Sequence, residues 1–192
     1  MRPRPDPAQV SEVGFYHLTT RSLHWALAKL LDNEDITNAQ LCRYVKGPDF
    51  PTGAQILGRQ GIIDAYKTGK GSIKVRAIAE IEEAGRETRI VVSEFPYEVS
   101  PEAVEERIAD LVKSGDLDGI SAVTNESAGR KSRLVVKLKR DANANVVLNK
   151  IFKNTQLQTS FAVNMLALVD GVPRTLNLLQ RSEEHTSELQ SH

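Results

Sequence analysis

The feature that most constrains the fold is a segment of alternating side chains at residues 72–83, SIKVRAIAEIEE. Its two faces are Ile73, Val75, Ala77, Ala79 and Ile81 on one side, and Lys74, Arg76, Ile78 and Glu80 on the other. A period of two is typical of a β-strand with one buried face. Because the turn sequence EAGRE follows at residues 83–87, we expect the strand to fold back as a hairpin on TRIVVSEF, residues 88–95.

A helix is expected after this hairpin. Ser100 is a favourable N-cap, Pro101 suits the first helical position, and Gly115 is a typical stop. The residues that fall on its apolar face are Val104, Ile108, Leu111 and Val112.

Further segments complete the predicted order of elements. Upstream, Thr37 and Gln40 form a capping box for a helix over residues 38–46, and a short helix is expected over residues 62–66. Downstream we expect, in this order, strands 119–125 and 133–139, a helix 141–154, and two strands within 161–178. This order predicts an α+β fold with a mostly antiparallel sheet and flanking amphipathic helices.

Composition excludes several classes of protein. The chain has 192 residues, enough for one domain or a piece of a larger protein, and its formal net charge is zero. A polybasic tail or an acidic activation segment would not balance in this way, so any nucleic-acid contact must come from a local patch. No stretch approaches the roughly 18 apolar residues of a membrane span. One cysteine, Cys42, and a start without an apolar signal region predict a cytoplasmic protein.

Motifs for enzyme chemistry were not found in the sequence. The run GKGS at residues 69–72 lacks both the Lys-Ser or Lys-Thr pair and the glycine spacing of a phosphate-binding loop. The histidines and the cysteine are not grouped at metal-ligand spacing, so we expect no metal site. Glu82 and Glu83 lie beside a turn, where we interpret them as solvated charges rather than a general acid and base.

Positive charge is the strongest chemical feature. Lys67, Lys70, Lys74 and Arg76 fall within ten positions, and no acidic residue interrupts residues 65–79. The neighbouring glycines would let a phosphate backbone approach the main chain, and alternation aims Lys74 and Arg76 to one side. We therefore predict these four side chains as DNA-binding residues, with a solvated strand face as the alternative.

A second basic cluster runs from a loop onto the strand at residues 133–139 and consists of Arg130, Lys131, Arg133, Lys137, Lys139 and Arg140. We rank it below the first cluster, with a solvated face again as the alternative. Tyr66 and Tyr97 are candidates for stacking on bases, although packing in the core or at its rim is the commoner fate of tyrosine.

Several longer motifs resemble one known family. They begin with GPDFPTG and DAYKTGKGSIKVRA and continue, in order, with SEFPYEV, IADLVKSGDLDGIS, VVKLKRDAN, VVLNKIFKNTQLQTSF and NMLALVDGVPRTLNL. Together they resemble the A subunit of bacterial type IIA DNA topoisomerases, with DNA gyrase the nearer branch and topoisomerase IV the next. The resemblance covers residues 28–180. Gln55 and Phe95 stand where aliphatic residues are expected, a difference that concerns packing.

This resemblance implies a function for the parent protein. Members of the family cut both strands of a DNA duplex through a tyrosyl phosphodiester, pass another duplex and reseal the break, which changes supercoiling. The implied partners are double-stranded DNA, a second A subunit, and a B subunit that binds the ATP and the Mg²⁺, so no cofactor is expected in this chain. Residues 28–180 resemble the tower region, a shoulder beside the DNA, and the family match favours backbone contact by Lys67, Lys70, Lys74 and Arg76.

The resemblance also implies that this segment performs no cleavage. The nucleophile of the family is a tyrosine preceded by arginine, upstream of the matched region, as is the isoleucine that wedges into the bent DNA. Here Tyr44 follows Arg43, but outside the sequence context of the nucleophile. We assign no catalytic residue and expect the chain alone to be inactive.

The two ends fall outside the resemblance. Residues 1–27 have no usable match, and a disordered segment and a false start are both open interpretations. Translating the opening of a common short-read sequencing adapter gives RSEEHTSELQS, identical to residues 181–191, so we interpret residues 181–192 as translated adapter. The alternative function is a free-standing, non-catalytic module that binds nucleic acid or is purely structural.

Overall fold

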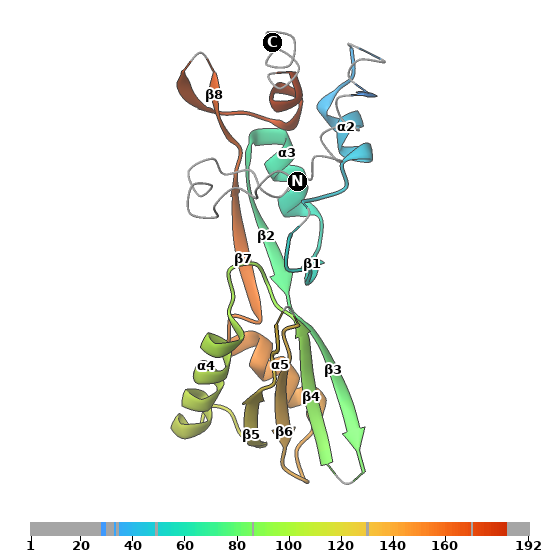
Figure 1. Ribbon diagram of the computed structural model, residues 1–192. Coiled ribbons are helices and arrows are strands. Elements are labelled where there is room, and N and C mark those ends of the chain that lie inside the picture. The colour runs from blue at the N-terminus through green and yellow to red at the C-terminus, as the bar shows by residue number, and fades with distance from the viewer. Residues whose placement is uncertain are drawn as a thin grey trace. The chain divides into compact units, whose positions relative to one another are not determined.

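A computed structural model describes residues 28–29, 33, 35–48, 50–85, 87–129, 131–169 and 171–183 (Figure 1). The interpretation of residues 1–27 concerns positions that lie outside this part of the chain, as do residues 184–192 of the C-terminal tail. The chain divides into two compact units. The first unit comprises Met1–Phe50, Gly58–Ile73 and Phe161–His192, and the second comprises Pro51–Leu57 and Lys74–Ser160.

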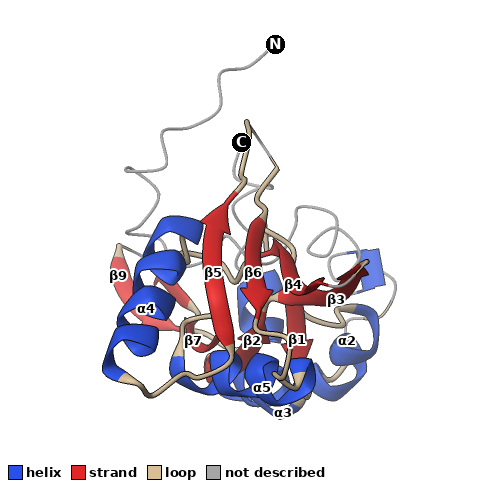
Figure 2. Cartoon of the chain, turned by 90° about the horizontal axis from the view of Figure 1, so that it is seen from below, coloured by secondary structure: helices blue, strands red, loops and turns tan. Residues whose placement is uncertain are grey.

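The second unit is built on a four-stranded antiparallel sheet. Its strands, in spatial order, are β3 (Ile78–Ala84), β4 (Glu87–Glu94), β6 (Leu134–Leu138) and β5 (Ile120–Asn125), which Figure 2 shows in red. The predicted hairpin is confirmed, because β3 pairs with β4 in antiparallel register. The pairs β4–β6 and β5–β6 are antiparallel as well, so the predicted α+β class with a mostly antiparallel sheet is confirmed.

Helix α4 (Pro101–Ser114) packs on this sheet and is bounded as the sequence predicts. The Ser100 hydroxyl caps its first turn, and Gly115, with a φ of 82°, ends it. Its buried residues are Val104, Ile108 and Leu111. Val112 was expected on the same face but is 36% exposed, so the apolar stripe is narrower than predicted.

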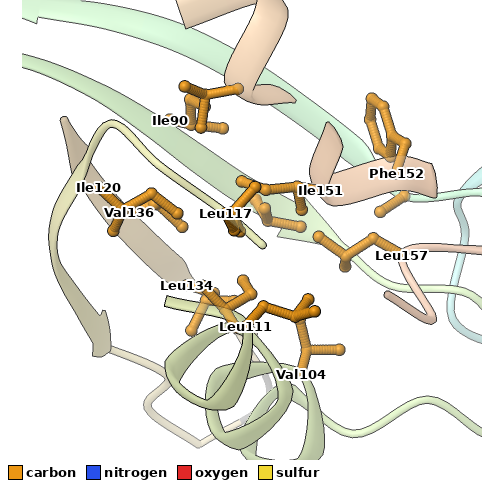
Figure 3. Packing of buried hydrophobic residues seen from close by; sticks show 14 of the residues in the cluster. Ile90, Val104, Leu111, Leu117, Ile120, Leu134, Val136, Ile151, Phe152 and Leu157 are labelled. Carbon is orange, nitrogen blue, oxygen red and sulfur yellow. The ribbon is translucent and has the colours of Figure 1, made fainter. Parts of the chain in front are cut away.

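Helix α5 (Ala144–Asn154) begins three residues later than predicted. Asn143, rather than Asp141, is its N-cap, and the Asn143 side-chain oxygen accepts hydrogen bonds from the next turn. Val147, Ile151 and Phe152 of this helix join α4 and the sheet in one hydrophobic cluster (Figure 3). The sheet contributes alternate residues to that cluster: Ile90, Val92, Ile120, Leu134, Val136 and Leu138.

The alternating segment at residues 72–83 forms two strands instead of the single strand predicted. β2 (Lys70–Arg76) and β3 belong to different sheets, and Ala77 lies between them. The Ala77 N–H donates a 2.7 Å hydrogen bond to the carbonyl oxygen of Leu157. Ile81 pairs with the buried Ile90 but is 37% exposed, because β3 is an edge strand. The side chains that the alternation correctly places inside are Ile73, Val75 and Ala77.

Strand β2 begins in the first unit and ends in the second, and β7 (Gln158–Asn164) passes back from the second to the first. With β1 (Gln55–Leu57) these strands form a sheet in the order β1, β2, β7. β1 is antiparallel to β2, with Gln55 opposite Arg76 and Leu57 opposite Lys74.

The first unit contains α2 (Asn38–Tyr44) and α3 (Gln60–Thr68). The capping box is confirmed: the Thr37 hydroxyl accepts from the Gln40 N–H, and the Gln40 side chain accepts from the Thr37 N–H at 2.8 Å. α2 ends two residues earlier than predicted, whereas α3 extends beyond residues 62–66 at both ends, because Gly69 in the left-handed conformation is its C-cap.

The final strands of the chain number three where two were predicted. β7 is followed by β8 (Leu166–Val169) and β9 (Val172–Thr175), which form a hairpin of their own. Met165 interrupts the run, since its N–H donates to Gly69 and its carbonyl accepts from the Leu176 N–H. Residues 178–183 are helical, and within the described ranges no helix is long and apolar enough to cross a membrane.

Candidate nucleic-acid interface

Lys67 and Lys70 lie at the junction of α3 and β2 in the first unit, and both side chains are exposed. Gly69 closes α3 by donating its N–H to Ala65 at 2.7 Å, and Thr68 stabilises the turn. The Thr68 hydroxyl donates to the carbonyl of Asp64 at 2.8 Å and accepts the Lys70 N–H at 3.2 Å. The two lysines therefore project from a tight, internally bonded turn.

Glycines around this turn serve internal packing. A Cβ on Gly71 would lie 2.8 Å from the Cβ of Ala65, and one on Gly69 would lie 2.5 Å from Leu176 and Thr175 atoms. The sequence led us to expect that these glycines admit a phosphate backbone. The structure instead fills the space beside them with α3 and β9 atoms, so any phosphate contact here belongs to the lysine side chains.

Lys74 and Arg76 belong to the second unit and lie on one side of β2, opposite the buried Val75. Lys74 is exposed and Arg76 is half-buried. The Nε of Arg76 donates a 2.8 Å hydrogen bond to the side-chain oxygen of Gln158, and its guanidinium carbon lies 4.7 Å from the ring centroid of Phe152. Neither partner was predicted, because Gln158 is 82 residues away and carries no local motif.

The second basic cluster is partly neutralised by acidic neighbours. Arg133 lies 3.1 Å from Glu126 and 3.8 Å from Glu82, and Glu82 also pairs with Arg89 at 2.8 Å. These exposed pairs contribute little stability, about 0–1 kcal/mol each, but they reduce the positive field. Other exposed cations of the cluster are Lys131, Lys137, Lys139 and Arg140, whereas Arg130 lies outside the described residues.

Tyr66 packs in the core of the first unit, which is the commoner of the two fates considered for it. Its side chain is 3% exposed, and its backbone carbonyl accepts a 2.7 Å hydrogen bond from the Asn38 side chain. The Tyr66 hydroxyl has no hydrogen-bond partner among the described residues. Burial, followed by the neighbouring Cys42, raises the pKa of Tyr66 well above its ordinary value. Tyr97, the other candidate for base stacking, is half-buried.

Other reactive groups in the described residues form no enzyme site. Burial raises the pKa of the Cys42 thiol, which keeps it protonated and weakly nucleophilic. In the part of the chain that the structure describes, no three His, Cys, Asp or Glu side chains are grouped to hold a metal ion. The exposed cations of the α3–β2 segment are therefore the chemical feature that needs a function.

Comparison with known proteins identifies the class. Residues 19–191 match the family model for the A subunit of DNA gyrase and topoisomerase IV. The chain belongs to this family. The match extends on both sides beyond residues 28–180, the range covered by the sequence motifs.

Individual relatives carry one name, the DNA gyrase A subunit. The chain is 49% identical over 156 residues to that of Halalkalibacterium halodurans, an alignment that covers 81% of the chain and 19% of the relative. It is 53% identical over 147 residues to that of Streptomyces coelicolor, covering 76% and 17%. For the protein of Mycobacterium tuberculosis the identity is 50% over 161 residues, covering 83% and 19%. The chain thus spans about a fifth of the length of these relatives.

Proposed function

We propose that this chain is part of a DNA gyrase A subunit, from the region that supports the cleaved duplex. The observation that carries this proposal is the identity of about half of the aligned residues to gyrase A subunits, over 76–83% of the chain. The parent enzyme would break, pass and reseal double-stranded DNA in an ATP-dependent manner. Topoisomerase IV is the second candidate, because the family description includes both enzymes.

Within that enzyme, the role proposed for this segment is backbone contact without chemistry. Lys67, Lys70 and Lys74 are exposed, and Arg76 is half-buried with a guanidinium that has no acidic partner among the described residues. Cations of this kind bind phosphates irrespective of base sequence and release counterions on binding. The tyrosines do not match the context of the cleavage nucleophile, so cleavage would need the remainder of the subunit.

The partners proposed for the parent protein follow from the family. They are double-stranded DNA, a second A subunit, and a B subunit that holds the ATP and Mg²⁺. A cytoplasmic location is proposed with them, since this is where a bacterial enzyme meets its chromosome.

DNA binding by the full chain tests this role. Fluorescence anisotropy with a labelled duplex, repeated over a series of salt concentrations, should give a log–log slope of roughly −3 to −4 if four phosphates are contacted. Lys74→Ala should reduce the magnitude of the slope by about one. The matched control is Lys137→Ala, an exposed strand lysine of the second cluster, which should leave affinity and slope unchanged. Equal effects of the two variants would contradict the assignment.

A free-standing binding or structural module is the competing function. The chain mixed with a gyrase B subunit, ATP and plasmid should leave the linking number unchanged, because it carries no assigned nucleophile. A change of linking number would contradict the proposal that cleavage needs the remainder of the subunit. Salt-independent or absent DNA binding would instead favour the structural module.

A further inference from the structure

Arg76 differs from the other structurally placed arginines of the second unit in how its guanidinium is held. Arg89 and Arg133 pair with Glu82 and Glu126. Arg76 has no acidic partner within the described residues, although it is half-buried. Two neutral groups orient it instead: Gln158 accepts its Nε–H at 2.8 Å, and the ring centroid of Phe152 lies 4.7 Å from its central carbon.

These two groups are themselves fixed by the core. Phe152 lies in the hydrophobic cluster and is 9% exposed. Gln158 follows the fully buried Leu157, whose carbonyl accepts the Ala77 N–H at 2.7 Å. Because Ala77 and Leu157 adjoin Arg76 and Gln158 in the chain, this backbone bond sets the two side chains opposite each other.

The arrangement leaves one edge of the guanidinium free. A guanidinium has five N–H donors in a planar fork. Gln158 takes the donor on Nε, and among the described residues no partner of either Nη of Arg76 is found. The edge formed by the two Nη atoms matches two oxygens of one phosphate, the geometry in which arginine binds phosphate bidentately. Stacking on Phe152 and the bond to Gln158 reduce the rotamer freedom that binding would otherwise remove.

We propose that Arg76 is a preorganised phosphate-binding fork for the DNA backbone, and that Gln158 is its positioning residue. This inference rests on the proposed function, which supplies DNA as the source of the phosphate. Lys74, two residues earlier on the same side of β2, acts as a simple point charge by comparison.

A double-mutant cycle on duplex affinity, measured by anisotropy with the full chain, tests the coupling. Arg76→Ala should weaken binding about tenfold and reduce the magnitude of the salt slope by about one. Gln158→Ala should weaken binding about three- to tenfold in the native background. The same change should have no effect in the Arg76→Ala background and its full effect in the Lys74→Ala background. Arg76→Lys should lose most of the affinity, since it keeps the charge but not the fork.

Gln158→Glu is the second variant, in case Gln158→Ala loosens β7. It keeps the acceptor at nearly the same position and neutralises the guanidinium, so it should lower affinity at least as much as Arg76→Ala. Thermal unfolding of every variant verifies that the fold persists.

The outcomes distinguish the fork from the proposed function. If Arg76→Lys binds as the native chain does, or Gln158→Ala acts equally with and without Arg76, the fork is overturned while DNA contact stands. If neither Lys74→Ala nor Arg76→Ala weakens binding, the proposed function fails and the fork fails with it.

Discussion

The backbone N–H of Ala54 donates a 2.8 Å hydrogen bond to a carboxylate oxygen of Glu94, forty residues further along the chain. Gly53 and Ala54 both have positive φ, 77° and 70°, so their N–H groups belong to a concave turn of the type that holds anions. The turn leads directly into β1, which pairs with Lys74 and Arg76 of β2. Glu94 thereby anchors the strand beside the proposed DNA-contacting residues.

Replacement of Glu94 by Gln should destabilise the chain. The substitution removes the charge from the hydrogen bond to Ala54, and we expect a loss of about 1–2 kcal/mol in the free energy of unfolding. Urea denaturation measures it. Glu83→Gln, at an exposed position of the β3–β4 hairpin, is the control and should change the free energy by less than about 0.5 kcal/mol. Equal values for the two variants would show that the turn needs no anion.

Gly71→Ala should be strongly destabilising. The added Cβ would meet the backbone and side chain of Ala65, so α3 and β2 would have to separate, at a cost of about 1–3 kcal/mol. Gly129→Ala is the matched control: its φ is 61°, but a Cβ there meets no atom within 4 Å. The control should cost about 1 kcal/mol from backbone strain alone. Thermal denaturation of both variants compares clash with strain, and a smaller loss for Gly71→Ala would contradict the packing described for α3.

Tyr66→Phe should be neutral or stabilising by up to about 1 kcal/mol at neutral pH, because the hydroxyl that it removes is buried without a hydrogen-bond partner among the described residues. A pH series adds a second readout. Burial raises the pKa of Tyr66 in the folded chain, so the unfolded chain ionises first, above the ordinary value of about 10. Stability is therefore complete below that pH and falls as the pH rises through it.

In Tyr66→Phe this alkaline loss of stability should be smaller than in the native chain. Tyr44→Phe, which alters a tyrosine that is 49% exposed, should retain the full loss. Urea unfolding at neutral pH and at about pH 11 distinguishes the two variants. An unchanged alkaline loss in Tyr66→Phe would mean that Tyr66 ionises freely in the folded chain.

Local signals in the sequence predicted the elements whose boundaries depend on caps and turns. Thr37 with Gln40, and Ser100 with Gly115, all act where the residue types indicate. The error at α5 is of the same local kind, because both Asp141 and Asn143 are good N-caps and only the packing of Val147 and Ile151 against the sheet selects Asn143.

This choice of cap is testable. Asn143→Ala should cost about 1 kcal/mol of stability, since it leaves the N–H groups of Asn145 and Val146 without their acceptor. Asp141→Ala should change the free energy by less than about 0.5 kcal/mol. Chemical denaturation of the two variants decides between them, and the reverse order would favour Asp141 as the cap.

Long-range features were not predictable from the sequence. Alternation continues across Ala77, so the pattern cannot show that β2 and β3 join different sheets; the hydrogen bond from Ala77 to Leu157 fixes that break. The candidate site follows the same rule. The four basic residues were visible as a run of charge, whereas the contacts of Arg76 with Gln158 and Phe152 depend on the return of β7 and α5 to β2.

The measurement that tests the central claim most directly compares duplex affinity of two fourfold variants of the full chain at low salt. One variant changes the proposed contact residues Lys67, Lys70, Lys74 and Arg76 to Ala. The other removes the same number of exposed cations from the second cluster: Lys131, Lys137, Lys139 and Arg140. The account predicts that the first variant loses DNA binding and that the second retains most of it. Equal loss in both variants, or native affinity in the first, would contradict it.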